Sequence, residues 1–191
     1  MAFVDIEMPE EFAESQRGPD GRVPNYAKVF AGRPAVYAAW QQLNAAIKQQ
    51  MDLRRYELAT FAAAARLRSS YCSLAHGQVL TQRFLSEQDL EAVATDRSAV
   101  LGEIDDAVMS LAEQVASDAG AVDQAGVDRL RALGLTDQDI VDVVLAATAR
   151  CFFSKTLDAL GVLPDPGYAE FGSERLRSAL VTGRPIEAAP E

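Results

Sequence analysis

The stretch that decides the fold is residues 57–76, ELATFAAAARLRSSYCSLAH. It holds the only histidine of the protein, His76, and one of its two cysteines, Cys72. These two residues are four positions apart, so on a helix their side chains share one face. Glu57 stands in an otherwise apolar run at the start of the stretch. The stretch therefore predicts a helical hairpin that brings a carboxylate, a thiol and an imidazole together.

Ser69 and Ser70 are typical residues for a helix start, so the second helix of the hairpin is expected to begin there. Cys72 then lies in the first turn, where unpaired backbone N–H groups and the helix dipole favour a thiolate. His76 lies one turn further on and can bond the sulfur or pass on its proton, and Glu57 can orient the imidazole. A thiolate is the nucleophilic form, so this arrangement suits attack on a peroxide oxygen.

Each of these residues also has an ordinary structural interpretation. A free cysteine is usually inert packing, a lone histidine on a helix is more often structural, and Ser69 is by default an N-cap. Glu57 is the least ordinary, because a carboxylate on an apolar stripe is costly unless it has a partner. The partner in a purely structural role would be one of the nearby arginines, Arg54, Arg55, Arg66 or Arg68.

The rest of the chain shows helical spacing. The residues Val36, Trp40, Leu43 and Ile47 predict the buried stripe of a helix that starts at Pro34, and Ile104, Val108, Leu111 and Val115 predict a second buried stripe. Ser86 and Thr136 resemble capping boxes, and Asp52 is a candidate N-cap. No segment shows strand alternation bounded by turns, so the sequence predicts an all-α fold.

The domain organisation is one helical domain with two flanking segments. Residues 1–23 form a weakly organised N-terminal arm, residues 24–171 form the helical domain, and residues 172–191 form a C-terminal tail. The tail contains one short helix, SERLRSALV, and then GRPIEAAPE, which is expected to be disordered or dependent on a partner.

Composition and charge exclude several classes of function. The net charge of −10 and the pI near 4.6 argue against nucleic acid or an anionic membrane surface as a partner. No apolar run is long enough to span a membrane, and the acidic N-terminus does not resemble a signal peptide. One histidine and two distant cysteines cannot supply a usual zinc site, and cofactor-binding motifs are absent. We therefore expect a cytoplasmic protein without metal or cofactor.

The hairpin resembles the motif of the alkylhydroperoxidase D and carboxymuconolactone decarboxylase superfamily, in particular its peroxidase-related branch. The motif is a glutamate, about a dozen residues, and then Cys-x-x-Cys-x-x-x-His at a helix start. It falls here on Glu57, Ser69, Cys72 and His76, and Tyr71 also matches. The similarity extends over roughly residues 24–165. It implies an AhpD-like helical bundle with the hairpin at its centre, and it implies that Cys72 is the peroxide-reacting thiol with Glu57 and His76 as the proton relay.

The sequence departs from the family motif at Ser69, which replaces the first cysteine. In the family that cysteine closes a disulfide with the second one, so the two-cysteine cycle cannot run here. Three outcomes are open: a one-cysteine peroxidase of weak or atypical activity with an external thiol reductant, resolution by Cys151, or loss of the redox activity.

The alternatives to a peroxidase are a decarboxylase-type enzyme that uses His76 and Glu57 without redox chemistry, and a non-catalytic binding protein. Whether the chain is an enzyme stays open at this point. The resemblance also implies a small-molecule substrate such as a peroxide and a homo-oligomer, either a trimer or a hexamer. The strongly apolar run over residues 140–153 agrees with burial against another subunit.

Overall fold

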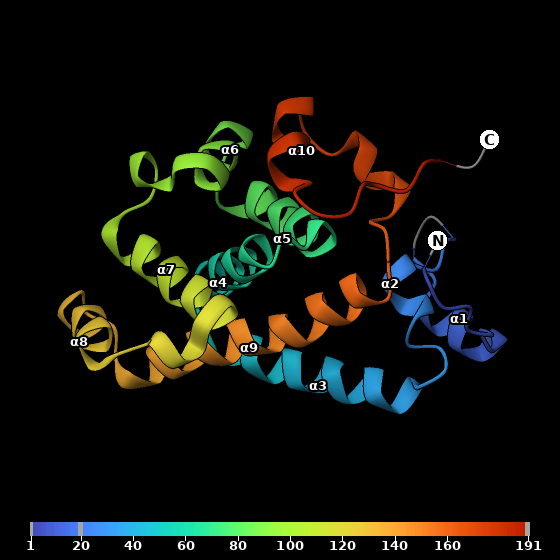
Figure 1. The fold of residues 1–191 in the computed structure, drawn as a ribbon, viewed down its shortest axis with the longest axis horizontal. Coiled ribbons are helices and arrows are strands. Elements are labelled where there is room, and N and C mark those ends of the chain that lie inside the picture. Colours follow the sequence, from blue (N-terminus) through green and yellow to red (C-terminus); the bar gives the residue numbers. More distant parts are fainter. Residues whose placement is uncertain (1, 19–20, 190–191) are drawn as a thin grey trace.

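The structure is a computed structural model that describes residues 2–18 and 21–189. Met1, residues 19–20 of the N-terminal arm and residues 190–191 of the tail lie outside the described residues. The described chain is helical and contains no strand, which confirms the all-α prediction (Figure 1). The helices are α1 (Glu10–Gln16), α2 (Asn25–Lys28), α3 (Pro34–Gln50), α4 (Leu53–Arg66), α5 (Ser70–Arg83), α6 (Glu87–Asp96), α7 (Glu103–Asp118), α8 (Gln124–Ala132), α9 (Asp137–Ala159) and α10 (Glu174–Leu180).

The starts of these helices follow from local side-chain chemistry. The Asp52 carboxylate accepts a hydrogen bond from the Arg55 backbone N–H at 3.0 Å and caps α4. Ser86 and Thr136 form the predicted capping boxes of α6 and α9 with an aspartate three residues on. Gly134, with a φ of +97°, allows the chain to leave α8. The starts of α4, α6 and α9 and the end of α8 are therefore encoded locally.

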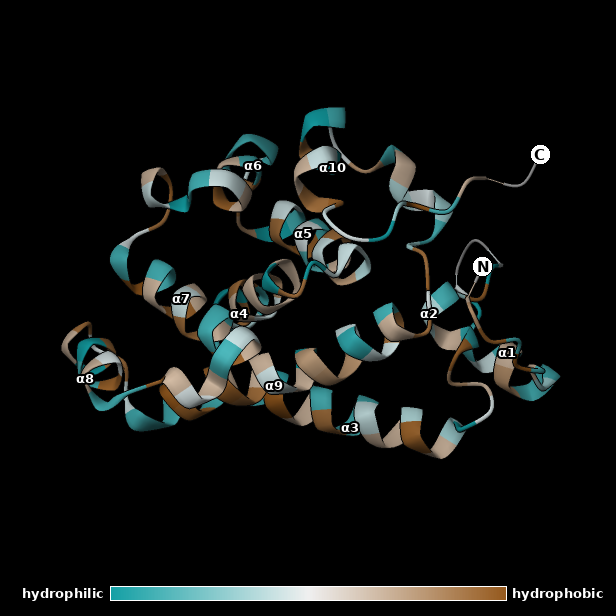
Figure 2. Cartoon of the chain, viewed as in Figure 1, coloured by the Kyte–Doolittle hydropathy of each residue, from teal (hydrophilic) through white to brown (hydrophobic). Residues whose placement is uncertain are grey.

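The centre of the molecule is α4, which packs against α5, α7 and α9 (Figures 1 and 2). Leu58, Ala59, Ala62 and Ala63 of α4 are fully buried, and the small alanines allow the neighbouring helices to approach closely. The helices α3 and α9 lie side by side, and α10 covers α5 and α6. No helix in the described part of the chain has the length and apolar character that crossing a membrane requires.

Two of the predicted buried stripes were partly wrong. Val36 and Leu43 of α3 are 46% and 52% exposed, whereas Tyr37 and Ile47 of the same helix are buried. Ile104, at the start of α7, is also exposed. The helix α3 packs mainly against α9, so only one side of it is covered. Spacing predicts that apolar residues share a face, but it does not say which faces a neighbour covers.

The tail end, which the sequence predicts to be disordered or dependent on a partner, is held against the rest of the chain at Gly183, Arg184 and Glu187. The Arg184 guanidinium donates to the Asp158 carbonyl oxygen at 2.6 and 3.1 Å, and the Glu187 backbone N–H donates to the Pro164 carbonyl oxygen at 2.9 Å. The Asn25 side chain also donates to Glu187 at 2.8 Å. These backbone contacts are not visible in a composition of glycine, proline and alanine.

Candidate functional site

The turn between α4 and α5 is held by the C-terminal tail. Arg68 adopts a φ of +58°, and its guanidinium donates to the Thr182 carbonyl oxygen at 2.7 and 3.0 Å. The Gly183 N–H donates to the Ser70 hydroxyl at 2.9 Å. A Cβ atom at residue 183 would lie 1.9 Å from the Arg68 carbonyl oxygen, so only glycine fits there. This close contact fixes where α5 begins. The helix starts at Ser70 with Ser69 as its N-cap residue, in agreement with the start predicted from these two serines.

The hairpin brings Glu57 and His76 into direct contact. The Glu57 side chain is 1% exposed, and its Oε2 lies 2.6 Å from the His76 Nδ1. The other carboxylate oxygen accepts a hydrogen bond at 2.8 Å from the Nζ of Lys48 on α3. The predicted meeting of acid and imidazole is therefore observed. The cation beside Glu57 is Lys48, whereas the sequence suggested one of four arginines.

The hydrogen bonds around His76 assign its proton to Nδ1. The Thr60 hydroxyl donates to the Tyr56 carbonyl oxygen at 2.8 Å, so its oxygen can accept from the His76 Nδ1 at 3.1 Å. Both neighbours of Nδ1, the Glu57 carboxylate and the Thr60 oxygen, are acceptors. The neutral imidazole therefore carries its proton on Nδ1, and Nε2 has a free lone pair.

Burial and charge keep this pair in the form of a carboxylate and a neutral imidazole. Burial, and next the nearby Arg150 cation, lower the pKa of His76 from 6.5 to about 4, although Glu57 acts in the opposite direction. Burial also raises the pKa of the Glu57 carboxyl, but the contacts with His76 and Lys48 outweigh it and hold that pKa below its usual value. At neutral pH His76 is therefore unprotonated.

The sulfur of Cys72 is buried and touches an arginine. Cys72 is 1% exposed, and its Sγ lies 3.5 Å from the Nη1 of Arg150 on α9. Arg150 itself is 5% exposed. Among the described residues no hydrogen bond joins the sulfur to His76 or Glu57. The expected hydrogen bond between His76 and the sulfur is thus not present in the described structure, and the Nδ1 of His76 bonds to Glu57 instead.

Ser69 and Tyr71 lie beside this cluster and have other partners. Ser69 is the N-cap residue of α5, but its buried hydroxyl does not cap the helix. The hydroxyl faces the Asp158 carboxyl instead. Burial raises the pKa of Asp158, and the Ser69 hydroxyl partly lowers it again. The Tyr71 hydroxyl donates to Asp165, and its ring packs edge-on against Tyr168 at 5.9 Å. The structure does not bring the Tyr71 hydroxyl to the acid and imidazole.

The second cysteine of the chain forms no disulfide with the first. Cys72 and Cys151 are both free thiols, and Cys151 is half-buried on α9. Burial raises the pKa of the Cys151 thiol. Within residues 2–18 and 21–189, no group of histidine, cysteine and acidic side chains is arranged to hold a metal ion.

The comparison with protein families agrees with this geometry. Residues 34–114 match the model of the carboxymuconolactone decarboxylase family. This segment contains α3, both helices of the hairpin and the acid–imidazole cluster, which consists of Lys48, Glu57, Thr60 and His76. This segment of the chain is therefore similar to the carboxymuconolactone decarboxylase family. Ser69 lies within the matched segment, at the position where the resemblance places the first motif cysteine.

Solved structures with the AhpD-like fold cover nearly the whole chain. An uncharacterized peroxidase-related protein with an alkylhydroperoxidase AhpD core from Ralstonia eutropha JMP134 has a TM-score of 0.74 at 18% identity, over 96% of this chain and 98% of that one. A peroxidase-related protein from Silicibacter sp. TM1040 has a TM-score of 0.74 at 20% identity, over 88% and 91%. ATU0492 from Agrobacterium tumefaciens, a putative antioxidant defence protein AhpD, has a TM-score of 0.64 at 20% identity, over 71% and 94%. No curated protein matches the sequence.

Sequence reasoning missed three residues of this candidate site: Lys48, Thr60 and Arg150. Thr60 lies one turn after Glu57, so helical spacing could have found it. Arg150 is a charge within the apolar part of α9, and the argument applied to Glu57 applies to it equally. Lys48 gives no such signal, because lysine is common on the exposed side of a helix.

Proposed function

We propose that the protein reduces small peroxides with Cys72 as its single reacting thiol. The observation that supports this most is the 2.6 Å contact between Glu57 and His76, one helical turn from Cys72, at the motif positions of a peroxidase-related fold. Glu57 orients the imidazole and His76 offers a free basic nitrogen at neutral pH. Because the sulfur is buried, we expect a small hydroperoxide to react faster than a bulky one.

The proposed reaction starts with transfer of the Cys72 proton to Nε2 of His76. The thiolate attacks the terminal oxygen of the hydroperoxide, the O–O bond breaks, and Cys72 becomes a sulfenic acid. The alkoxide that leaves takes the proton back from the imidazolium and departs as an alcohol. Two molecules of an external thiol then reduce the sulfenic acid to the thiol, with one disulfide and one water formed. Ser69 cannot form a disulfide, so the reductant attacks Cys72 directly. Free thiols of this kind are kept reduced in the cytoplasm, where we place the protein.

The test is peroxide consumption with dithiothreitol as the reductant. We expect turnover in the wild type and in Cys151→Ser, and none in Cys72→Ser. His76→Gln and Glu57→Gln should lose about 10²–10⁴-fold in rate, the usual contribution of a proton-transfer group. Mass spectrometry of Cys72 trapped with dimedone should show the sulfenic acid. No turnover and no trapped sulfenic acid in the wild type would end the proposal.

A non-redox function of the decarboxylase type is the second candidate. It is favoured by the fact that the acid–imidazole pair is complete without the sulfur, since no hydrogen bond joins Cys72 to either residue in the described structure. His76 would then move a proton on a lactone or acid substrate. Retained activity of Cys72→Ser on such a substrate would establish this function, and its loss would exclude it. The close Glu57–His76 contact favours these two candidates over a non-catalytic binding protein.

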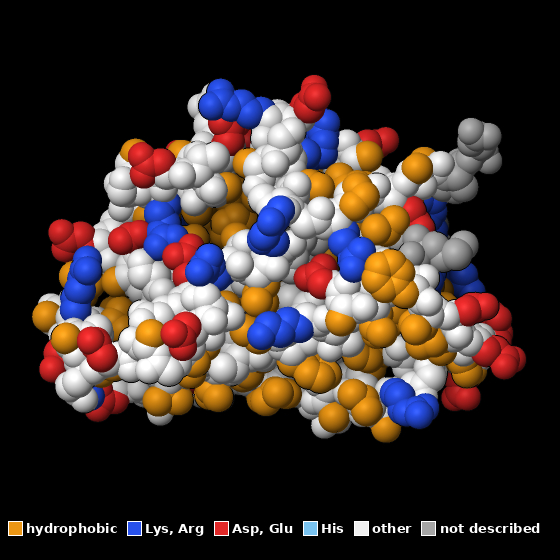
Figure 3. Space-filling view, viewed as in Figure 1, with side chains coloured by type: hydrophobic (Ala, Val, Ile, Leu, Met, Phe, Trp, Pro, Cys, Tyr) orange, Lys and Arg blue, Asp and Glu red, His pale blue; other side chains and the backbone are white. Residues whose placement is uncertain are grey.

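We also propose that copies of this chain assemble through the apolar stripe, which consists of Val36, Leu43, Val141, Leu145 and Phe152. These side chains are exposed on α3 and α9, the two helices that lie side by side, and hydrophobic side chains gather along this lower edge in Figure 3. Contiguous exposed apolar surface of this kind is typical of interfaces. Light scattering should show a trimer or hexamer for the wild type. The double variant Leu43→Glu with Phe152→Glu should be a monomer. The control Gln49→Glu, at an exposed position of α3 outside the apolar stripe, should keep the oligomer. A monomeric wild type would contradict assembly.

A further inference from the structure

We propose that Arg150 is a catalytic residue, the counter-ion of the Cys72 thiolate, and that its remaining donors receive the peroxide oxygen. This rests on the proposed peroxide reduction. Arg150 lies within the long helix α9, opposite the first turn of α5, and its Nη1 is 3.5 Å from the sulfur. No position of the family motif falls on α9, so the motif alone assigns Arg150 no role.

The first argument is that Arg150 is a buried cation without a carboxylate. Its side chain forms no ion pair with an acidic residue in the part of the chain that the structure describes. Its guanidinium instead lies near the rings of Trp40 and Phe153, with centroid distances of 5.9 and 5.5 Å. Burying an unpaired charge is costly, and aromatic faces compensate only part of that cost. A negative charge on the Cys72 sulfur would compensate the rest.

The second argument concerns donors that have no protein partner. The Nε of Arg150 and the hydroxyl of Ser154, one turn further along α9, are both buried and make no hydrogen bond within the described residues. Trp40 Nε1, on the ring beside the guanidinium, is in the same state. Buried donors are nearly always satisfied in native proteins. A group of free donors beside a reactive sulfur can bond the oxygens of a peroxide and hold the charge of the alkoxide that leaves.

The third argument is the division of labour with His76. The positive charge of Arg150 contributes to the low pKa of His76, so a nearby cation helps keep the imidazole neutral at neutral pH. Arg150 stabilises the negative sulfur, while His76 and Glu57 move the proton. Charge is thus supplied by α9, and proton transfer by α4 and α5.

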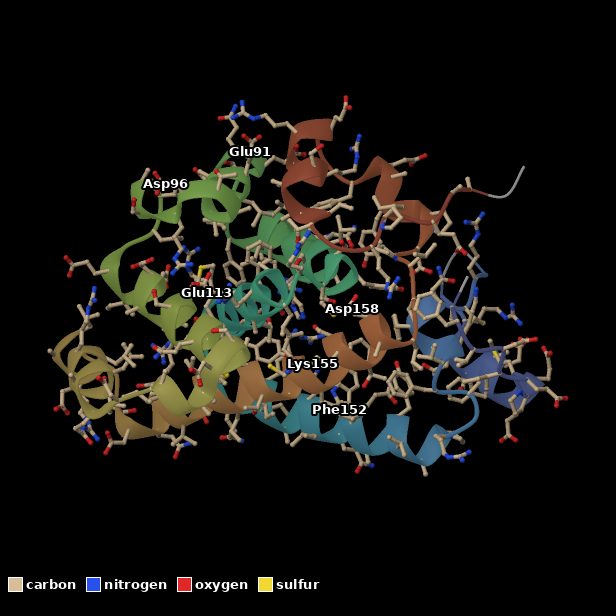
Figure 4. All side chains as sticks on the ribbon, viewed as in Figure 1. Glu91, Asp96, Glu113, Phe152, Lys155 and Asp158 are labelled. Carbon is tan, nitrogen blue, oxygen red and sulfur yellow. The ribbon has the colours of Figure 1, made fainter. Side chains whose placement is uncertain are left out.

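The test measures the thiolate directly by its ultraviolet absorbance in a Cys151→Ser background, where Cys72 is the only thiol. A titration from acidic to alkaline pH compares the Cys151→Ser protein with the same protein that also has Arg150→Lys or Arg150→Met. The protein with both Cys151→Ser and Cys72→Ser is the blank. Lys155→Met is the matched control, because Lys155 is an exposed cation on the same helix (Figure 4). This readout requires neither peroxide nor access to the buried sulfur.

We expect the ratio of thiolate to thiol at neutral pH to fall about tenfold or more in Arg150→Met, the usual effect of losing one close opposite charge. Arg150→Lys should restore part of it, and Lys155→Met should not change it. In peroxide turnover Arg150→Met should lower kcat and kcat/KM together. An unchanged thiolate titration in Arg150→Met would overturn the inference. A changed titration in a wild type without peroxide turnover would retain the counter-ion and reject the peroxidase function, so the two failures are distinguishable.

Discussion

The acid–imidazole cluster and the sulfur–arginine pair lie in one site but differ in how well their polar groups are satisfied. Glu57 has Lys48 and His76 on its two oxygens, and Thr60 bonds the same imidazole. Arg150 has one long contact to sulfur and an Nε without a partner in the described structure. Complete networks stabilise a fold, whereas incomplete ones cost stability and are kept for another reason. The difference indicates that the first cluster holds the hairpin together in addition to its proposed part in proton transfer, whereas the second is kept for chemistry alone.

The largest effect is expected from breaking the satisfied cluster at Glu57. Glu57→Ala removes two hydrogen bonds and leaves His76 and Lys48 without their acceptor, so the free energy of unfolding should fall by about 2–4 kcal/mol. Chemical denaturation measures this. Glu57→Gln, which keeps the shape and one acceptor, should lose clearly less. Equal stability of Glu57→Ala and the wild type would mean that the cluster does not hold the hairpin.

The pH dependence of stability should show the same cluster. Because the fold lowers the pKa of His76 from 6.5 to about 4, the unfolded chain binds more protons between these values. The contribution of His76 is complete above pH 6.5 and is lost as the pH falls toward 4, by on the order of 2–3 kcal/mol. Subtracting the stability curve of His76→Gln from that of the wild type separates the contribution of His76 from the contributions of the carboxylates. Parallel curves for the two proteins would show that His76 titrates normally.

Arg150→Met tests the sulfur–arginine pair, for which we expect the opposite effect on stability from that of Glu57→Ala. Replacing an incompletely paired buried cation by an apolar side chain of similar length should leave the free energy of unfolding unchanged or raise it by about 1–2 kcal/mol. Thermal and chemical denaturation measure this alongside the loss of thiolate. A loss of stability as large as that in Glu57→Ala would show that Arg150 is a structural residue and that the two clusters are alike.

The smallest effect is expected at Lys48, which is the solvent-facing part of the satisfied cluster. Its side chain is 42% exposed, so water can replace it as the partner of Glu57. Lys48→Met should lower the free energy of unfolding by only about 0.5 kcal/mol. A double-mutant cycle with Glu57→Gln measures the pair directly. A coupling above about 2 kcal/mol would show that the pair behaves as fully buried.

The sequence was sufficient for the fold class, the hairpin and the meeting of Glu57 with His76, because these depend on short-range spacing. Cys72 and His76 share one face of α5 because of their spacing, and the short turn of the hairpin brings that helix against α4, which carries Glu57. It was not sufficient for Arg150, Lys48 or the exposure of Val36 and Leu43, because those depend on which helix lies opposite. The ordered tail was missed for the same reason, since the contacts of residues 182–187 are with backbone groups far away in the chain.

The contact between residues 68–70 and 182–183 has a consequence for the order of folding. These partners are 113 and 114 positions apart, so the loop that joins them must close before Arg68 can reach Thr182. Contacts at such separation are slow to form, and we expect this one to close after the hairpin itself is helical. A folding molecule therefore passes through a stage in which the beginning of α5 is uncovered. Reducing conditions during refolding should protect the Cys72 sulfur from oxidation at that stage.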